Sequence, residues 1–121
     1  MKKVVCLQSI SKLQEYRHRM RRENLEKQIR DAVHQHLPDV QAYIYGSEAR
    51  GEAKSDSDVD VLLLVNGPKP GFAERQVLIA PLYDIELETG YSINPHIESV
   101  SDWETLQSVF KYQVMKDRIR V

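Results

Sequence analysis

The chain has 121 residues, which suits one domain with a buried core and leaves no room for a separate substrate domain. Lysine and arginine total 17 and aspartate and glutamate 18, a net charge of -1 that argues against nucleic acid as a partner. The single Cys6 cannot form an internal disulfide, no apolar run is long enough to span a membrane, and no secretory signal is apparent, so we expect the cytoplasm as its location.

The first predicted element is a long helix over about residues 9–37, which Pro38 ends. Its apolar side chains form two stripes whose phase changes between Met20 and Leu25. The helix therefore either breaks in this interval or presents a second face. Residues 40–45 then form a short predicted strand that leads into a turn of small residues.

A buried strand is predicted over residues 59–65, which are apolar at every position after the second. Such a run is typical of a central strand with both faces covered. Between the two strands, residues 49–57 are polar and suit a short helix or a loop. Residues 66–71 are rich in glycine and proline and form a predicted turn.

The next predicted helix covers residues 72–89 and contains Pro81, which lacks a backbone donor and should kink or restart it. Gly90 suits the end of this helix. The strand that follows, over 91–97, contains Pro95, which favours an edge position in a sheet. The apolar side chains expected near one face of the helix are Phe72, Ile79, Tyr83 and Leu87.

The last predicted helix begins at a capping-box pattern, Ser101 to Glu104, and runs through Phe110 to about residue 116, with Trp103 and Tyr112 packing it. The element order is thus helix, strand, strand, helix, strand, helix. This order predicts an α/β (α+β) fold, with a small mixed sheet flanked by helices. We expect residues 1–121 to form a single domain, divided into a helical segment, a catalytic core and a C-terminal helix at 1–38, 40–98 and 101–121.

Two carboxylates, Asp58 and Asp60, stand at the start of the buried strand. Side chains alternate along a strand, so both point to one face, ~6.6 Å apart. At that distance they repel by roughly 2 kcal/mol at an effective dielectric near 20, and a cation is needed to hold the pair. The turn at Gly46 and Ser47 offers small side chains and free N–H groups that suit a phosphate. Metal carboxylates beside such a turn indicate phosphoryl or nucleotidyl transfer.

These residues resemble the nucleotidyltransferase superfamily that includes DNA polymerase beta, and most closely its minimal nucleotidyltransferases. The matching residues are Gly46, Ser47, Ala49, Arg50 and Gly51, followed by Ser57, Asp58, Val59, Asp60 and Val61. The resemblance covers about half of the chain. It implies that Gly46 and Ser47 contact a nucleoside triphosphate, and that the catalytic Asp58 and Asp60 hold two Mg²⁺ ions.

Arg50 is a candidate for nucleotide binding, because a guanidinium group binds phosphate through two hydrogen bonds and Arg50 lies within the motif. The alternative is a surface arginine that pairs with a nearby acid. The acids close to it in the sequence are Glu48, Glu52 and Asp56.

One departure from the family concerns a third carboxylate, which the family usually carries on the next core strand. No aspartate occurs in this part of the chain. If alternation holds, Ser92, Asn94, His96 and Glu98 share a face. Three alternatives stay open: Glu98 supplies the carboxylate, His96 acts as the base, or the site is incomplete.

The leading function is Mg²⁺-dependent transfer of a nucleoside monophosphate, with AMP from ATP as the first choice, to an acceptor hydroxyl with release of pyrophosphate. Because the chain is small, we expect a partner protein or a homodimer to complete the site. The resemblance also implies an antitoxin role, since minimal nucleotidyltransferases are often paired with a helical toxin-like protein. The alternative is a catalytically silent nucleotide-binding or antitoxin-type interaction module.

Overall fold

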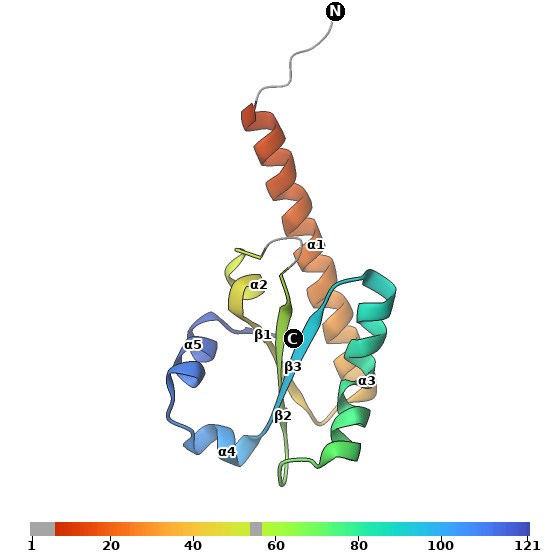
Figure 1. The fold of residues 1–121 in the computed structure, drawn as a ribbon, viewed down its shortest axis with the longest axis vertical. Helices are drawn as coiled ribbons and strands as arrows, with labels where there is room; N and C mark the ends of the chain where they lie inside the picture. The colour runs from red at the N-terminus through yellow and green to blue at the C-terminus, as the bar shows by residue number, and fades with distance from the viewer. Residues whose placement is uncertain (1–6, 54–56) are drawn as a thin grey trace, which may run out of the picture.

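The computed structural model describes residues 7–53 and 57–121, except for some side chains in the first half of the N-terminal helix. The described strands form one sheet, and helices pack around it (Figure 1). The elements are α1 (Leu7–His36), β1 (Gln41–Tyr45), α2 (Gly46–Arg50), β2 (Val59–Val65), α3 (Phe72–Thr89), β3 (Ile93–Ser99), α4 (Val100–Thr105), α5 (Val109–Asp117) and β4 (Ile119–Arg120).

The sheet has four strands in the order β3-β2-β1-β4. β1 runs antiparallel to both β2 and β4, whereas β3 runs parallel to β2 after the crossover through α3. The predicted α/β class with a small mixed sheet is therefore confirmed. β2 is internal, as its apolar sequence predicts, and β3 lies at an edge, as Pro95 predicts.

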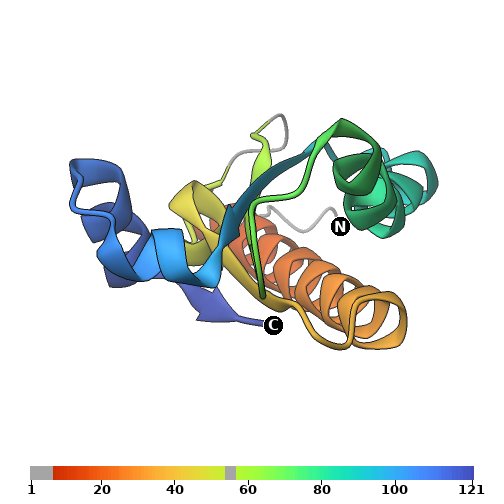
Figure 2. The same cartoon turned by 90° about the horizontal axis from the view of Figure 1, so that it is seen from below.

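Helices cover both faces of the sheet (Figure 2). Alternate residues of β2 point to opposite faces, so Val61 and Leu63 join the larger core under α1 and α3, and Leu62 joins a smaller core with Trp103. Each fully buried aliphatic side chain of this size contributes about 1.5–3 kcal/mol to stability. The buried β2 strand thus fixes both layers of the fold.

The N-terminal helix α1 is continuous, so the change of phase in its sequence marks a second face rather than a break. Leu25, Ile29 and Val33 recur every four residues and are fully buried against the sheet. The first turns of α1 project beyond the sheet (Figure 1), and Leu13 and Tyr16 are about half exposed there. Cys6 lies outside the described residues.

Helix α3 has the predicted bounds and runs through Pro81 without a restart, ending at Gly90 in the left-handed conformation. The predicted inward face is wrong, because Phe72, Tyr83 and Leu87 are exposed. Leu82 and Ile85 are buried instead. The sequence offers two adjacent apolar stripes, and packing onto the sheet selects the one through these two residues.

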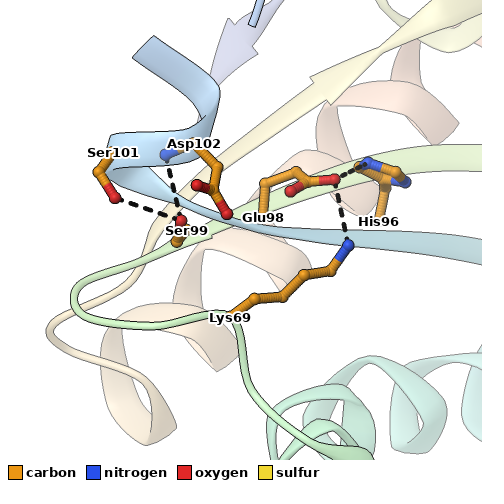
Figure 3. A network of polar contacts seen from close by, with 6 residues as sticks. All are labelled: Lys69, His96, Glu98, Ser99, Ser101 and Asp102. Carbon is orange, nitrogen blue, oxygen red and sulfur yellow. Dashed lines mark hydrogen bonds and ion pairs between the residues drawn. The ribbon is translucent and has the colours of Figure 1, made fainter. Parts of the chain in front are cut away.

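The C-terminal part also differs from the prediction. The expected single helix is two helices, α4 and α5, separated by a short break, and the short strand β4 follows them. Ser99, not Ser101, caps α4, because the Asp102 N–H donates to the Ser99 hydroxyl at 3.2 Å (Figure 3). Trp103 is buried as expected, whereas Tyr112 is 70% exposed.

In the part of the chain that the structure describes, no helix has both the length and the apolar character that crossing a membrane requires.

The cap assignment predicts different effects for two neighbouring serines. Ser99→Ala removes the acceptor for the Asp102 N–H and should lower the free energy of unfolding by about 1 kcal/mol. Ser101→Ala is the matched control and should change it by less than about 0.5 kcal/mol, because Ser101 is exposed. Urea denaturation measures both values. A larger loss in the Ser101 variant would contradict the assignment.

Candidate functional site

Three polar side chains form a row across the sheet at one end of β2. Asp60 is the second residue of β2 and lies opposite Tyr45 on β1 and Asn94 on β3. Asp58 is exposed just before the strand. The sequence-predicted carboxylates therefore lie where the middle strands of the sheet meet the β1–α2 turn.

The turn between β1 and α2 lies directly against Asp60. Gly46 has a φ of 74°, in the left-handed region that side chains disfavour. A Cβ atom at Gly46 would lie 2.5 Å from the Asp60 Oδ2 atom, closer than Cβ atoms normally approach other atoms, so the carboxylate would have to move. The positive φ strains any other residue here, and the close approach to Asp60 adds to the preference for glycine. The structure thus brings Gly46 next to Asp60, as the spacing of the motif suggests.

Asp60 carries a charge that its neighbours compensate only in part. Burial raises the pKa of its carboxyl group, and the nearby Asp58 raises it further, whereas the hydrogen bond from Asn94 and the charge of Arg50 lower it. Burial and the negative charge of Asp60 also raise the pKa of Tyr45 to about 12, so this phenol stays protonated at neutral pH. A divalent cation would stabilise such a pair of carboxylates.

Arg50 holds α2 to the end of α5. Its Nε atom lies 3.0 Å from Glu52 Oε2, and its Nη1 atom lies 3.0 Å from Asp117 Oδ2. Both partners raise the pKa of Arg50, which stays charged. The geometry matches the alternative of a paired surface arginine, and the Asp117 partner could not be anticipated from the sequence. Its charge still influences the Asp60 pKa, so it lies within electrostatic reach of the site.

Two polar residues of β3, His96 and Glu98, lie further along the strand. They are opposite Leu62 and Leu64 in the register, so they lie about 7 and 13 Å from Asn94 along the strand. The Glu98 Oε1 atom pairs with His96 Nε2 at 3.1 Å and with Lys69 Nζ at 3.5 Å (Figure 3). The structure therefore places Asn94 beside Asp60, rather than the two candidates His96 and Glu98.

Glu48 is a buried acid that the sequence suggested only as a partner for Arg50. Its side chain is 1% exposed, and neither carboxylate oxygen has a hydrogen-bond partner in the described part of the chain. Such a placement costs free energy, because burial removes water without a replacement. Arg50 pairs with Glu52 and Asp117 instead, so the suggested pairing with Glu48 is wrong.

The face of the sheet beside the polar row is covered by an aromatic side chain of α5. The Phe110 ring packs edge-on against Tyr45 at 5.7 Å, His96 at 5.2 Å and Trp103 at 6.2 Å between centroids. Edge-to-face contacts of this kind are favourable. Phe110 thus packs over Tyr45 and His96, next to the polar row, and remains partly exposed.

The carboxylates of Asp58 and Asp60 suit a metal ion only if a bound substrate supplies further ligands. Within residues 7–53 and 57–121, no three histidine, cysteine or acidic side chains are grouped as a complete metal site. Mg²⁺, however, is usually held by one or two carboxylates together with phosphate oxygens and water. Asp58 and Asp60 beside the glycine turn match that ligand set.

Residues 26–119 match the Nucleotidyltransferase domain family. The chain belongs to this family, which places it among the enzymes that transfer nucleotidyl groups. The family in general uses divalent metals. A search of curated protein sequences found no match.

Solved structures share the fold. A toxin–antitoxin structure with AMP-PNP has a TM-score of 0.57 and 16% identity, over 78% of this chain and 70% of the other. A variant of the toxin–antitoxin MntA–HpeT gives 0.56 and 15%, over 79% and 70%. A proposed nucleotidyltransferase from Sulfolobus solfataricus gives 0.54 and 20%, over 88% and 84%. These identities are low, so the similarity establishes the fold.

The contact between Gly46 and Asp60 predicts a large effect of a single methyl group. Gly46→Ala should lower the free energy of unfolding by about 2 kcal/mol or more, through backbone strain and the clash with Asp60. Gly67→Ala is the matched control, since Gly67 also has positive φ but an added Cβ would meet no described atom within 4 Å. Denaturant unfolding compares them. Equal losses would show that the clash contributes nothing.

The raised pKa of Asp60 predicts a pH-dependent stability of the metal-free protein. A raised pKa means that the folded state binds the proton more tightly than the unfolded state, so stability falls as pH rises from the ordinary value of 3.8 through the raised one. Asp60→Asn should therefore raise the melting temperature in EDTA at pH 7, and the difference should shrink as pH falls toward 3.8.

Asp84→Asn, an exposed change on α3, is the matched control for the Asp60 variant. Thermal unfolding from pH 4 to pH 8 measures the difference between the two variants. A gain for Asp60→Asn that stays constant with pH, or that grows at low pH, would contradict the electrostatic cause.

Proposed function

We propose that the chain is a Mg²⁺-dependent nucleotidyltransferase that transfers AMP from ATP to an acceptor hydroxyl and releases pyrophosphate. The observation that carries the proposal is the contact of the Gly46 turn with the Asp60 carboxylate, beside Asp58. In this arrangement a turn that suits a phosphate, at Gly46, lies directly beside carboxylates that suit a cation, at Asp58 and Asp60. Family membership supports the reaction class.

In this proposal each motif residue has a separate role. Gly46 and Ser47 bind the triphosphate, since their turn has small side chains and its backbone can approach an anion closely. Asp58 and Asp60 are the catalytic residues and hold two Mg²⁺ ions, which neutralise the developing charge on the phosphates when bound. Arg50 binds a phosphate oxygen with donors that its pairs with Glu52 and Asp117 leave free.

In the transfer, one bond to the α-phosphorus forms, another bond to it breaks, and the acceptor hydroxyl loses its proton. The acceptor oxygen forms a bond to the α-phosphorus, and the bond from that phosphorus to the bridging oxygen of pyrophosphate breaks. Asn94 is an amide and cannot take the hydroxyl proton, and His96 and Glu98 lie further along β3, so in this proposal the proton passes to water or to a phosphate oxygen. The enzyme contributes mainly by positioning the groups and neutralising charge.

The acceptor and the partner form a second part of the proposal. One similar structure is a toxin–antitoxin with AMP-PNP, which supports an adenine nucleotide and a protein partner here as well. We propose a cytoplasmic protein of one domain, completed by a partner protein or a second copy. A partner protein's hydroxyl is then the first acceptor to test, and an antitoxin role is the biological setting.

The competing function is a silent nucleotide-binding or antitoxin-type module. The amide of Asn94, in contact with Asp60 where a base would be useful, favours this alternative. Both functions predict that the protein binds a nucleotide, but only the enzymatic one predicts that the nucleotide is turned over. Pyrophosphate release with ATP, Mg²⁺ and candidate acceptors separates them.

Single substitutions in the carboxylate pair test the enzymatic proposal. Asp58→Asn and Asp60→Asn should each reduce pyrophosphate release by about 100-fold or more, because the charge that recruits the cation is lost. Asp84→Asn should leave it unchanged. Release that persists in both site variants would refute the assignment, and ATP binding without release in the unaltered protein would favour the silent module.

A further inference from the structure

The Asn94 side chain donates a hydrogen bond to the carboxylate pair. It lies opposite Asp60 in the parallel β2–β3 register. Its Nδ2 atom donates to the Asp60 Oδ1 atom at 3.2 Å. Its side chain is exposed, so the amide is accessible from the open side of the site.

We propose that Asn94 is the positioning residue of the metal site, and that its neutral amide limits how tightly Asp58 and Asp60 hold a divalent cation. The inference rests on the proposed function, because it assumes that this pair receives the cation. It goes further by assigning the third position of the site to a residue that carries no charge.

Two observations support the assignment. The hydrogen bond fixes the orientation of the Asp60 carboxylate and occupies one lone pair of Oδ1. The other polar candidates of β3, His96 and Glu98, pair with each other and leave the position beside Asp60 to Asn94. An aspartate has the same shape as an asparagine, so replacing Asn94 changes the charge with little change in volume.

The direction of the effect follows from charge. A third carboxylate within hydrogen-bond distance of Asp60 repels it more strongly than Asp58 does across the strand spacing. The metal-free protein would then be less stable. A cation gains attraction from the added charge, since ligand charge count sets the affinity of carboxylate sites for divalent ions. Compared with an aspartate at this position, the neutral amide therefore lowers the affinity for a cation and raises the stability of the metal-free protein.

The test is Mn²⁺ binding by calorimetry, together with thermal unfolding in EDTA and in Mn²⁺, on the full chain. Asn94→Asp should bind Mn²⁺ about tenfold more tightly, melt at a lower temperature in EDTA and gain more from Mn²⁺ than the unaltered protein. Asn94→Ala should bind Mn²⁺ several-fold more weakly, because the carboxylate loses its orienting bond. Asn66→Asp makes the same charge change beyond the other end of β2 and is the matched control.

The outcomes separate this inference from the proposed function. Suppose that the unaltered protein binds Mn²⁺ through Asp58 and Asp60. If both Asn94 variants then bind Mn²⁺ with the affinity of the unaltered protein, the inference is overturned and the proposed function stands. If neither the unaltered protein nor Asn94→Asp binds Mn²⁺, both fail. Should Asn94→Asp fail to fold even with Mn²⁺, the affinity of Asn94→Ala decides, and an unchanged value overturns the inference.

Discussion

The carboxylates of Asp58 and Asp60 repel each other, and the neighbouring residues offset this repulsion only in part. Asp58 and Asp60 bring two negative charges to the start of an internal strand, and burial raises the pKa of Asp60. Asn94 supplies only a neutral hydrogen bond, and Arg50 is divided between Glu52 and Asp117. Functional sites commonly store this kind of unfavourable electrostatics, because a ligand then releases it on binding. The remaining elements hold the pair in place.

The fold holds the pair through strand register and backbone proximity. β1 runs antiparallel to β2 and pairs Tyr45 with Asp60, so Gly46, the next residue, lies beside the Asp60 side chain. β3 runs parallel to β2 and brings Asn94 to the same level from the other side. The apolar residues of β2 anchor this row in both cores. Carboxylates, an amide and a glycine turn thus lie together at this end of the sheet.

Local features of the sequence predicted much of this. The apolar run after Asp60 predicted the internal strand, Gly90 predicted the end of α3, and Pro95 predicted an edge strand. The motif residues also suggested a turn next to a carboxylate pair, and the structure places Gly46 and Asp60 in contact. Each of these inferences needs only neighbouring residues and the alternation of side chains along a strand.

Features that depend on pairing between distant segments could not be predicted in the same way. The choice of Asn94 over His96 and Glu98 is set by the register between β2 and β3, and a shift of two residues would have favoured His96. Arg50 pairs with an acid 67 positions away. The cap at Ser99 depends on where β3 ends, and the inward face of α3 depends on packing.

The most direct test of the central claim is the location of the cation in a crystal of the protein with Mn²⁺ and a non-hydrolysable ATP analogue. We expect anomalous density for manganese about 2.1 Å from carboxylate oxygens of Asp58 and Asp60, with the triphosphate on the Gly46 turn. Manganese bound elsewhere, or the two carboxylates paired with guanidinium groups and no density beside them, would contradict it.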